Sequence, residues 1–281
     1  MPVVFAMTLL NDLKILGNNL IKQDYIMPIM FVGHGSPMNA IEDNEFSREW
    51  GRIGKSLVKP QAILSISAHW LTKGTFVTAM ENPRTIHDLY GFPKELFDVN
   101  YPAPGNPQLA SKTQLLINKT KVKLDQEWGL DHGTWSVIRK MYPGAEIPVL
   151  QLSIDYTKDL RWHFELAKEL FELRKKGILI LGSGNLVHNL KMLNWQNPEG
   201  IYEWAEEINE KFKENISTNN YNKLINYDEL GTEAKLAIPS PDHYIPMLYI
   251  LGLLSTNEQV SYFNDKTVLG SISMTSFVSV K

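Results

Sequence analysis

The chain has 281 residues, a formal net charge of −3 and no cysteine. Hydrophobic residues make up 43% of the sequence and aromatic residues 10%, which is enough for a substantial core. The charge balance gives no bulk attraction to nucleic acid or to an anionic membrane, so we expect neither partner. Without cysteine there is no disulfide and no thiolate ligand, which indicates the reducing cytoplasm and leaves any metal to His, Asp and Glu.

The N-terminal segment MPVVFAMTLL is apolar but lacks a basic start, and Asn11 and Asp12 interrupt it, so we predict no signal peptide. Leucines at helical spacing predict an amphipathic helix over residues of about 8–22. We therefore interpret residues 1–26 as a helical N-terminal extension. No apolar run in the sequence approaches the roughly 20 residues needed to cross a bilayer, and we expect a soluble protein.

From residue 27 onward, strand-like runs alternate with stretches long enough to hold crossover helices. This alternation predicts an α/β fold, a single domain over residues 27–281 with a central, mostly parallel (mixed) sheet and helices on both faces. The expected strands are 29–32, 62–67, 76–80, 149–154, 178–181 and a final strand within 268–280. The expected helices are 45–57, 107–117, 158–175 and 202–215, and the proline-rich stretch 92–107 is expected to be a long ordered loop.

Two histidines directly follow predicted strands. His34 lies between two glycines after the run IMFV, and His69 ends the run AILSISA. Ligands of open α/β sheets bind outside the carboxyl ends of the strands, so both imidazoles should reach one edge of the sheet. Imidazole suits zinc, iron, copper and nickel, and the pair therefore predicts a metal site for one of these ions.

Two further histidines are expected at helix starts. GSGN at 182–185 lacks the third glycine of a dinucleotide-binding loop, and we interpret it as a strand-to-helix turn that places His188 in the first helical turn. His243 follows Ser240 as a candidate N-cap and Pro241 as a candidate first helical residue. A helix N-terminus disfavours the imidazolium, which would leave both rings free to bind a metal.

The sequence DHGTW supplies another candidate, His132, ahead of a predicted helix. If it faces the site, its imidazole could accept and return a substrate proton, and its alternative role is a capping or surface residue. We assign no role to His87 or His163. The sequence contains no GxSxG elbow, no HExxH helix and no EF-hand loop, which argues against serine hydrolases and zincins.

Several blocks, in this order and spacing, closely resemble the class III extradiol ring-cleavage dioxygenases of the LigB-like family, in particular the branch that acts on DOPA. They cover about residues 27–281 and read GHGSPMNAIEDN, PQAILSISAHW, TIHDLYGFP, YPAPGNP, DHGTWSVIRKMYP, PVLQLSID, GSGNLVHNL and PDHYIPMLYILG. The resemblance implies cleavage of a catechol ring beside its two hydroxyls by O₂ at a non-haem Fe(II), although some members hold zinc.

Carried over residue by residue, the resemblance implies His34, His69 and His188 as metal-binding residues, with His243 also placed at the metal. It implies His132 as an acid/base or substrate-binding group. Relatives that cleave protocatechuate use two histidines and a glutamate, whereas His243 occupies the region of that glutamate here. Which of His188 and His243 ligates and which moves protons therefore stays open.

The expected partners are a small-molecule catechol such as L-DOPA and O₂, and the expected cofactor is one divalent metal ion, Fe(II) or Zn(II). Two alternatives use the same histidines, namely a zinc hydrolase that activates water and a catalytically silent metal-binding protein. Aromatic residues near the predicted site are candidate ring contacts, and these are Trp70, Tyr90, Phe92 and Tyr244.

Overall fold

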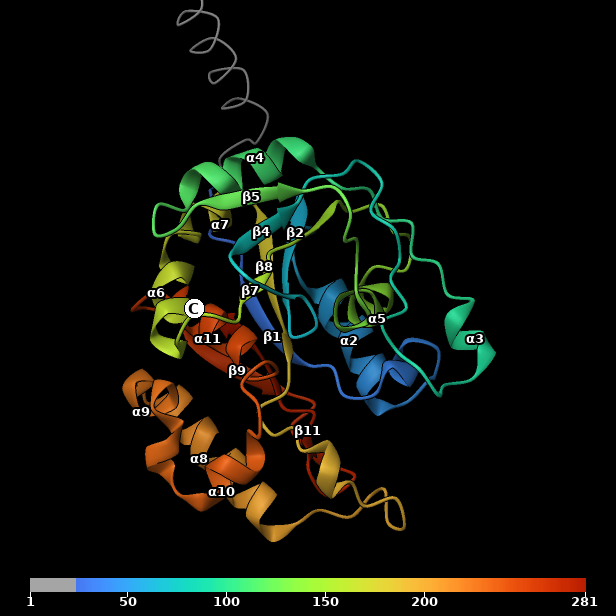
Figure 1. The fold of residues 1–281 in the computed structure, drawn as a ribbon, viewed down its shortest axis with the longest axis vertical. Coiled ribbons are helices and arrows are strands. Elements are labelled where there is room, and N and C mark those ends of the chain that lie inside the picture. Colours follow the sequence, from blue (N-terminus) through green and yellow to red (C-terminus); the bar gives the residue numbers. More distant parts are fainter. Residues whose placement is uncertain (1–23) are drawn as a thin grey trace, which may run out of the picture.

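The computed structural model describes residues 24–281, and the helix expected over residues 8–22 lies outside this range. A six-stranded sheet runs through the molecule in the order β6-β2-β8-β1-β12-β9 (Figure 1). The first four strands are parallel neighbours, and β12 is antiparallel to the strands on both of its sides. The expected α/β fold with a mostly parallel, mixed sheet is confirmed. The strands are β6 (Val149–Gln151), β2 (Ala62–Ser67), β8 (Ile178–Gly184), β1 (Ile29–Gly33), β12 (Ser276–Val280) and β9 (Gln259–Phe263).

The central strands are buried on both faces, as expected for parallel strands covered by helices. In β1, Ile29 and Phe31 join one hydrophobic core, whereas Met30 and Val32 join a second core on the opposite face. The first core is covered by α6 (Leu160–Lys168) and α11 (Ile245–Gly252), and the second by α2 (Glu45–Ser56) and α5 (His132–Met141). The expectation of helices on both faces is therefore also confirmed.

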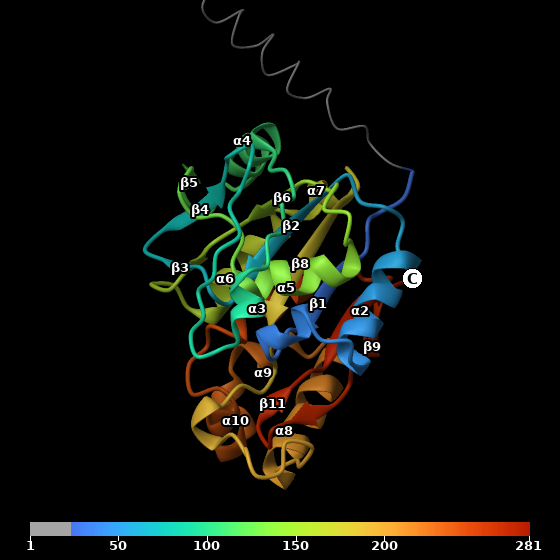
Figure 2. The ribbon, with the colours of Figure 1, turned by 90° about the vertical axis from the view of Figure 1, so that its right-hand side faces the viewer.

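Smaller elements surround this centre. Three two-stranded sheets pair β3 (Leu71–Thr72) with β7 (Ile154–Asp155), β4 (Thr75–Thr78) with β5 (Val122–Asp125), and β10 (Thr267–Val268) with β11 (Ile272–Ser273). Figures 1 and 2 show α8, α9 and α10 grouped at one end of the molecule and α4 with β4 and β5 at the other. The remaining helices are α3 (Lys94–Phe97), α4 (Pro107–Leu116), α7 (Phe171–Arg174), α8 (Glu203–Ser217), α9 (Tyr221–Ile225) and α10 (Thr232–Ala237), with short 3-10 helices at Pro37–Ala40, Leu190–Met192 and Tyr227–Leu230.

Polar caps explain where several helices begin. The side chain of Asn44 accepts a hydrogen bond from the Ser47 backbone N–H, and the Ser47 side chain accepts one from the Asn44 N–H, which forms a capping box at the start of α2. The side chains of Asn106 and Asp131 each accept one backbone N–H hydrogen bond, from Leu109 and Thr134, and so cap α4 and α5. Helices α2 and α4 begin at the residues that the sequence predicts, Glu45 and Pro107.

Three expected elements differ from the structure. The helix expected over 158–175 is divided into α6 and α7, because Glu169 and Leu170 donate to the carbonyls three residues earlier and form a tighter turn. The strand expected over 149–154 is divided into β6 and β7. The expected loop 92–107 contains the short helix α3.

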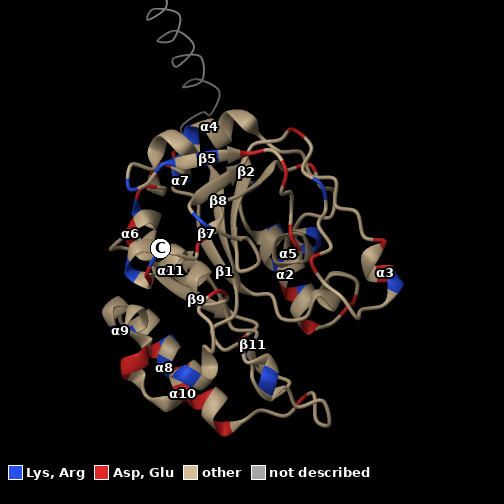
Figure 3. Ribbon diagram, viewed as in Figure 1, with Lys and Arg blue, Asp and Glu red and all other residues tan. Residues whose placement is uncertain are grey.

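Charged residues are distributed over the outside of the molecule. Figure 3 shows Lys and Arg interspersed with Asp and Glu, on α8 and α10 as well as on α6. Across residues 24–281 the structure has no helix that is both long enough and apolar enough to span a membrane.

The register of the parallel strands brings three chain segments to one edge of the sheet. Val32 of β1 and Ser67 of β2 both pair with Ser183 of β8, so the carboxyl ends of these three strands are level. The residues that follow these strands therefore leave the sheet side by side, at the edge where open α/β sheets bind their ligands.

Candidate metal centre

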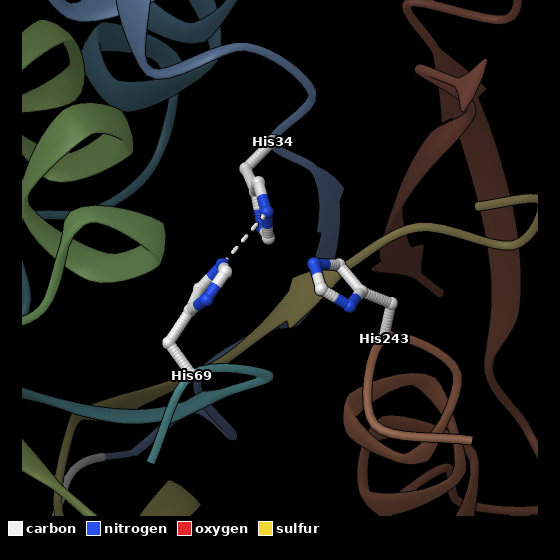
Figure 4. Close-up of side chains that lie close together, drawn as sticks. All are labelled: His34, His69 and His243. Carbon is white, nitrogen blue, oxygen red and sulfur yellow. Dashed lines mark hydrogen bonds between the residues drawn. The ribbon is translucent and has the colours of Figure 1, made fainter. Parts of the chain in front are cut away.

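Three imidazoles meet at this edge of the sheet. His34 follows β1, His69 lies two residues beyond β2, and His243 lies two residues before α11. Figure 4 shows the three rings converging, and one ligand nitrogen from each lies within 4.8 Å of the others. The Nε2 atoms of His34 and His69 are 3.2 Å apart. Two imidazole nitrogens bound to one zinc ion at about 2.0–2.1 Å are separated by roughly this distance.

The other ring nitrogen of each of these histidines faces a neighbouring polar group. Nδ1 of His34 is 3.0 Å from Oγ of Ser183, and Nδ1 of His243 is 2.6 Å from Oδ2 of Asp242. Nδ1 of His69 is 3.8 Å from Oδ2 of Asp88, which is an ion-pair distance rather than a hydrogen bond. Histidines that bind metals commonly donate their second N–H to such partners, and this leaves Nε2 for the ion.

Burial disfavours the charged form of His34 and of His69. It is the largest cause that lowers the pKa of His34 well below its ordinary value, and the neighbouring His243 and His132 lower it further. Burial and the same neighbours, with His132 first, also lower the pKa of His69. A neutral imidazole has a free nitrogen lone pair, so the crowding of these rings suits a cation between them.

His132 lies beside this triad, at the first residue of α5, and the helix expected to start there is confirmed. Its ring centroid is 3.9 Å from that of His69. Asp88 holds it in two places, because Oδ1 accepts the His132 backbone N–H at 2.9 Å and Oδ2 lies 3.0 Å from Nδ1. The second contact is within ion-pair distance, but Nδ1 makes no hydrogen bond of good angle. His132 therefore lies where it could contact a ligand of the triad.

His188 is also at the site, but its ring does not converge with the triad. It stacks on the ring of His243, with centroids 3.5 Å apart and an interplanar angle of 7°. Within residues 24–281, two groups of three ligand atoms lie close together, one from His34, His69 and His243 and one from His69, Asp88 and His132, and neither contains His188. Burial, followed by His243, lowers the pKa of His188 to about 3, so this ring is neutral.

The helix start predicted at His188 is wrong. Strand β8 continues to Gly184, and His188 then forms an isolated bridge with Ile272. The reason lies in the glycines of GSGN, which permit close packing rather than a helical turn. A Cβ atom at Gly184 would lie 2.1 Å from the carbonyl oxygen of His243, and one at Gly182 would lie 2.6 Å from that of Pro246.

The helix start predicted at Ser240 is also wrong. Helix α11 begins at Ile245, and the N–H groups of Tyr244 and Ile245 both bond to the carbonyl of Pro241 in a preceding turn. The carbonyl of His243 accepts a hydrogen bond from the Asn185 N–H at 2.9 Å, which fixes this turn against the end of β8. His243 thus reaches the site from a turn.

Sequence reasoning missed the polar partners of the histidines. Asp88 directly follows His87 in the sequence, and Asp242 directly precedes His243. An aspartate next to a histidine was therefore the sequence signal that could have indicated these partners. Burial is the largest single effect and would raise the pKa of Asp242, but the hydrogen bond and charge attraction of His243, together with the hydrogen bond of Ser240, lower the pKa overall. Asp242 is therefore a carboxylate that orients His243.

The candidate aromatic contacts separate into buried and exposed residues. Tyr244 is a core residue whose hydroxyl donates to the Leu224 carbonyl, and Trp70 is buried and stacks on Trp128. The side chain of Tyr90 is 91% exposed. Phe92 is half-buried and packs against the second core.

The two histidines that were given no role lie outside the triad. His87 contacts the carbonyl of Val99 through Nε2 at 3.0 Å. His163 is fully buried in α6, where Nδ1 lies 3.0 Å from the Tyr249 hydroxyl.

An α/β sheet whose strand ends and adjoining turn bring several imidazoles together defines a protein that can hold a divalent metal beside a small ligand. The family model for the catalytic LigB subunit of aromatic ring-opening dioxygenases matches residues 27–276, and the chain belongs to this family. The resemblance found in the sequence is thus confirmed.

The particular relatives fall in one branch of the family. The chain is 48% identical over 256 residues to a 4,5-DOPA dioxygenase extradiol of Escherichia coli strain K12, and the match covers 89% of this chain and 93% of the relative. It is 34% identical over 263 residues to the protein of the same name from Beta vulgaris, with 91% and 97% covered. A crystal structure of an uncharacterized Escherichia coli K12 protein superposes with a TM-score of 0.79 at 43% identity, over 90% of this chain and 99% of that one.

Proposed function

We propose that the chain is a metal-dependent extradiol dioxygenase that opens the ring of a catechol such as L-DOPA, by 4,5-cleavage with O₂. The observation that carries this proposal is the convergence of His34, His69 and His243 at the strand ends of a LigB-family fold. Relatives named 4,5-DOPA dioxygenase extradiol support the choice of substrate class.

The residues that would hold the metal are His34, His69 and His243, since their ligand nitrogens are close together and their other nitrogens have partners. Three neutral nitrogen donors fit Fe(II) and Zn(II) alike. A bound Fe(II) would supply the redox chemistry between catechol and O₂, whereas zinc is redox-inert. We therefore propose Fe(II) for the active enzyme and regard zinc as a competing occupant.

His132 is proposed as the group that moves a proton between the catechol and the protein. Its Nδ1 faces the carboxylate of Asp88, which would stabilise the imidazolium formed when Nε2 accepts a phenolic proton. The pKa of His188, about 3, makes protonation unfavourable there, so we propose that this ring orients substrate as a neutral hydrogen-bonding group. This assignment divides the expected roles of His188 and His243, with His243 as the ligand.

The test is oxygen consumption by protein loaded anaerobically with Fe(II). Addition of L-DOPA and air should give a yellow ring-opened product with one O₂ consumed per catechol, and His34→Ala should abolish the reaction with the loss of bound metal. No oxygen uptake with any catechol, from protein shown to hold Fe(II), would remove the dioxygenase proposal. Ester or amide cleavage by zinc-loaded protein would instead favour a hydrolase, and metal binding without either activity would favour a silent protein.

A further inference from the structure

Ser183 lies beneath the metal triad and contacts none of its Nε2 atoms. It is in the central strand β8 and is completely buried. Its Oγ lies 3.0 Å from Nδ1 of His34 and donates a hydrogen bond to the carbonyl of Gly133 at 2.6 Å. One hydroxyl therefore joins the histidine after β1 to the first turn of α5.

The direction of these hydrogen bonds follows from counting protons. A serine hydroxyl has one proton, and a carbonyl oxygen can only accept. The contact with Gly133 therefore uses the Ser183 proton, and Nδ1 of His34 has to be the donor in the other contact. A neutral imidazole carries one N–H, so its Nε2 is then left with the lone pair.

We propose that Ser183 is a positioning residue that fixes His34 as the Nδ1–H tautomer and thereby presents the Nε2 lone pair to the metal. The proposal rests on the metal triad of the proposed function, but not on any catechol chemistry. The Gly133 carbonyl is essential to it, because a hydroxyl without a committed proton could donate to Nδ1 and stabilise the opposite tautomer.

Two of the triad histidines, His34 and His243, then differ in the kind of group that faces Nδ1. His243 has the carboxylate of Asp242 at Nδ1, and a carboxylate accepts without needing a further partner. His34 has a neutral hydroxyl, whose direction is set by a backbone carbonyl. Because Ser183, His34 and Gly133 are all buried, water cannot readily replace the hydroxyl if it is removed.

Ser183→Ala is the test, and Ser65→Ala is a matched control. Ser65 is a completely buried serine on the adjacent strand β2, and its Oγ also bonds to the first turn of α5, at 2.8 Å from Oγ1 of Thr134. Among residues 24–281, Ser65 Oγ forms no hydrogen bond with a histidine ring. The control therefore loses a similar buried hydrogen bond without changing the surroundings of His34.

Zinc affinity, measured by competition with a chromophoric chelator, should fall about 10- to 100-fold in Ser183→Ala, the usual effect of losing a ligand's supporting partner. Ser65→Ala should bind zinc as the wild type does. Equal zinc affinity of Ser183→Ala and wild type would overturn the proposal, and so would an equal loss in both variants.

A second measurement uses the wild-type protein and does not depend on whether Ser183→Ala folds. Long-range ¹⁵N–¹H spectra of the wild type, with and without zinc, report the tautomer of each imidazole, and His34→Gln assigns the His34 signals. We expect the Nδ1–H form of His34 in both samples. An Nε2–H form in the metal-free protein would refute the role of Ser183 alone, whereas failure of the wild type to bind zinc would refute the metal site itself.

Discussion

Gly133 offers the sharpest test of how α5 shapes the metal site. It is the second residue of α5, and a Cβ atom there would lie 2.6 Å from Oγ of Ser67 and 2.9 Å from Cδ2 of His69. To reach ordinary van der Waals separation, the His69 ring has to move by about 0.6 Å. Functional constellations tolerate errors of about 0.5 Å, so Gly133→Ala should displace Nε2 of His69 from its ligating position.

We expect Gly133→Ala to lower zinc affinity about 10- to 100-fold, which corresponds to about 1.4–2.7 kcal/mol. Alanine is the better helix former by about 1 kcal/mol, so the loss would not come from helix propensity. The assay is a zinc competition titration, combined with urea unfolding of the metal-free protein.

Gly54→Ala is the control for this experiment. Gly54 is also a helical glycine, and its added Cβ would lie 2.6 Å from the Met141 carbonyl oxygen, where no histidine is in contact. It should lower the free energy of unfolding and leave the zinc affinity of the folded protein unchanged. Unchanged zinc affinity in folded Gly133→Ala would refute the reasoning.

Three other outcomes can be checked directly. His243→Ala should lose bound metal on dialysis whereas His188→Ala should retain it, and the reverse order would make His188 the ligand. Asp88→Asn should lower kcat about 10- to 100-fold at unchanged metal content, and an unchanged kcat would remove Asp88 from the support of His132. Burial lowers the pKa of His163 to about 4 in the folded protein. As the pH falls from 6.5 to 4, His163 is protonated in the unfolded chain but not yet in the folded protein, so the free energy of unfolding decreases. The loss is about 3 kcal/mol, and in metal-free His163→Gln the drop in unfolding free energy over this range should be correspondingly smaller.

The sequence alone was sufficient to predict the central sheet and the positions of some of the histidines at the site. Apolar runs that end in histidine predicted His34 and His69 at one edge, because parallel strands with crossover helices place their carboxyl ends together. The segment DHGTW predicted His132 ahead of a helix, and the structure adds Asp131 as the N-cap of that helix. These predictions depend on local sequence and on a general rule of sheet topology. The structure places His34 and His69 at one edge of the sheet and His132 at the start of α5, as predicted.

The relation between His188 and His243 could not be obtained in this way. It depends on how closely the turn before α11 approaches β8. Gly184 permits that close approach, but a glycine at this position in the sequence does not by itself predict it. A Gly-rich strand end and a Gly-rich helix start look alike in sequence. The domain boundary at residue 27, the cytoplasmic location and the absence of a nucleic-acid partner stay predictions.

The reversed strand β12 supports the backbone beside the metal triad. It pairs with β1 from the far end of the chain, and the Ser276 hydroxyl accepts a hydrogen bond from the N–H of Gly33, the residue before His34. A nascent chain on the ribosome has already exposed His34 and His69 while this support is still missing. The backbone beside His34 is therefore completed by a hydroxyl that lies 243 positions further along the chain.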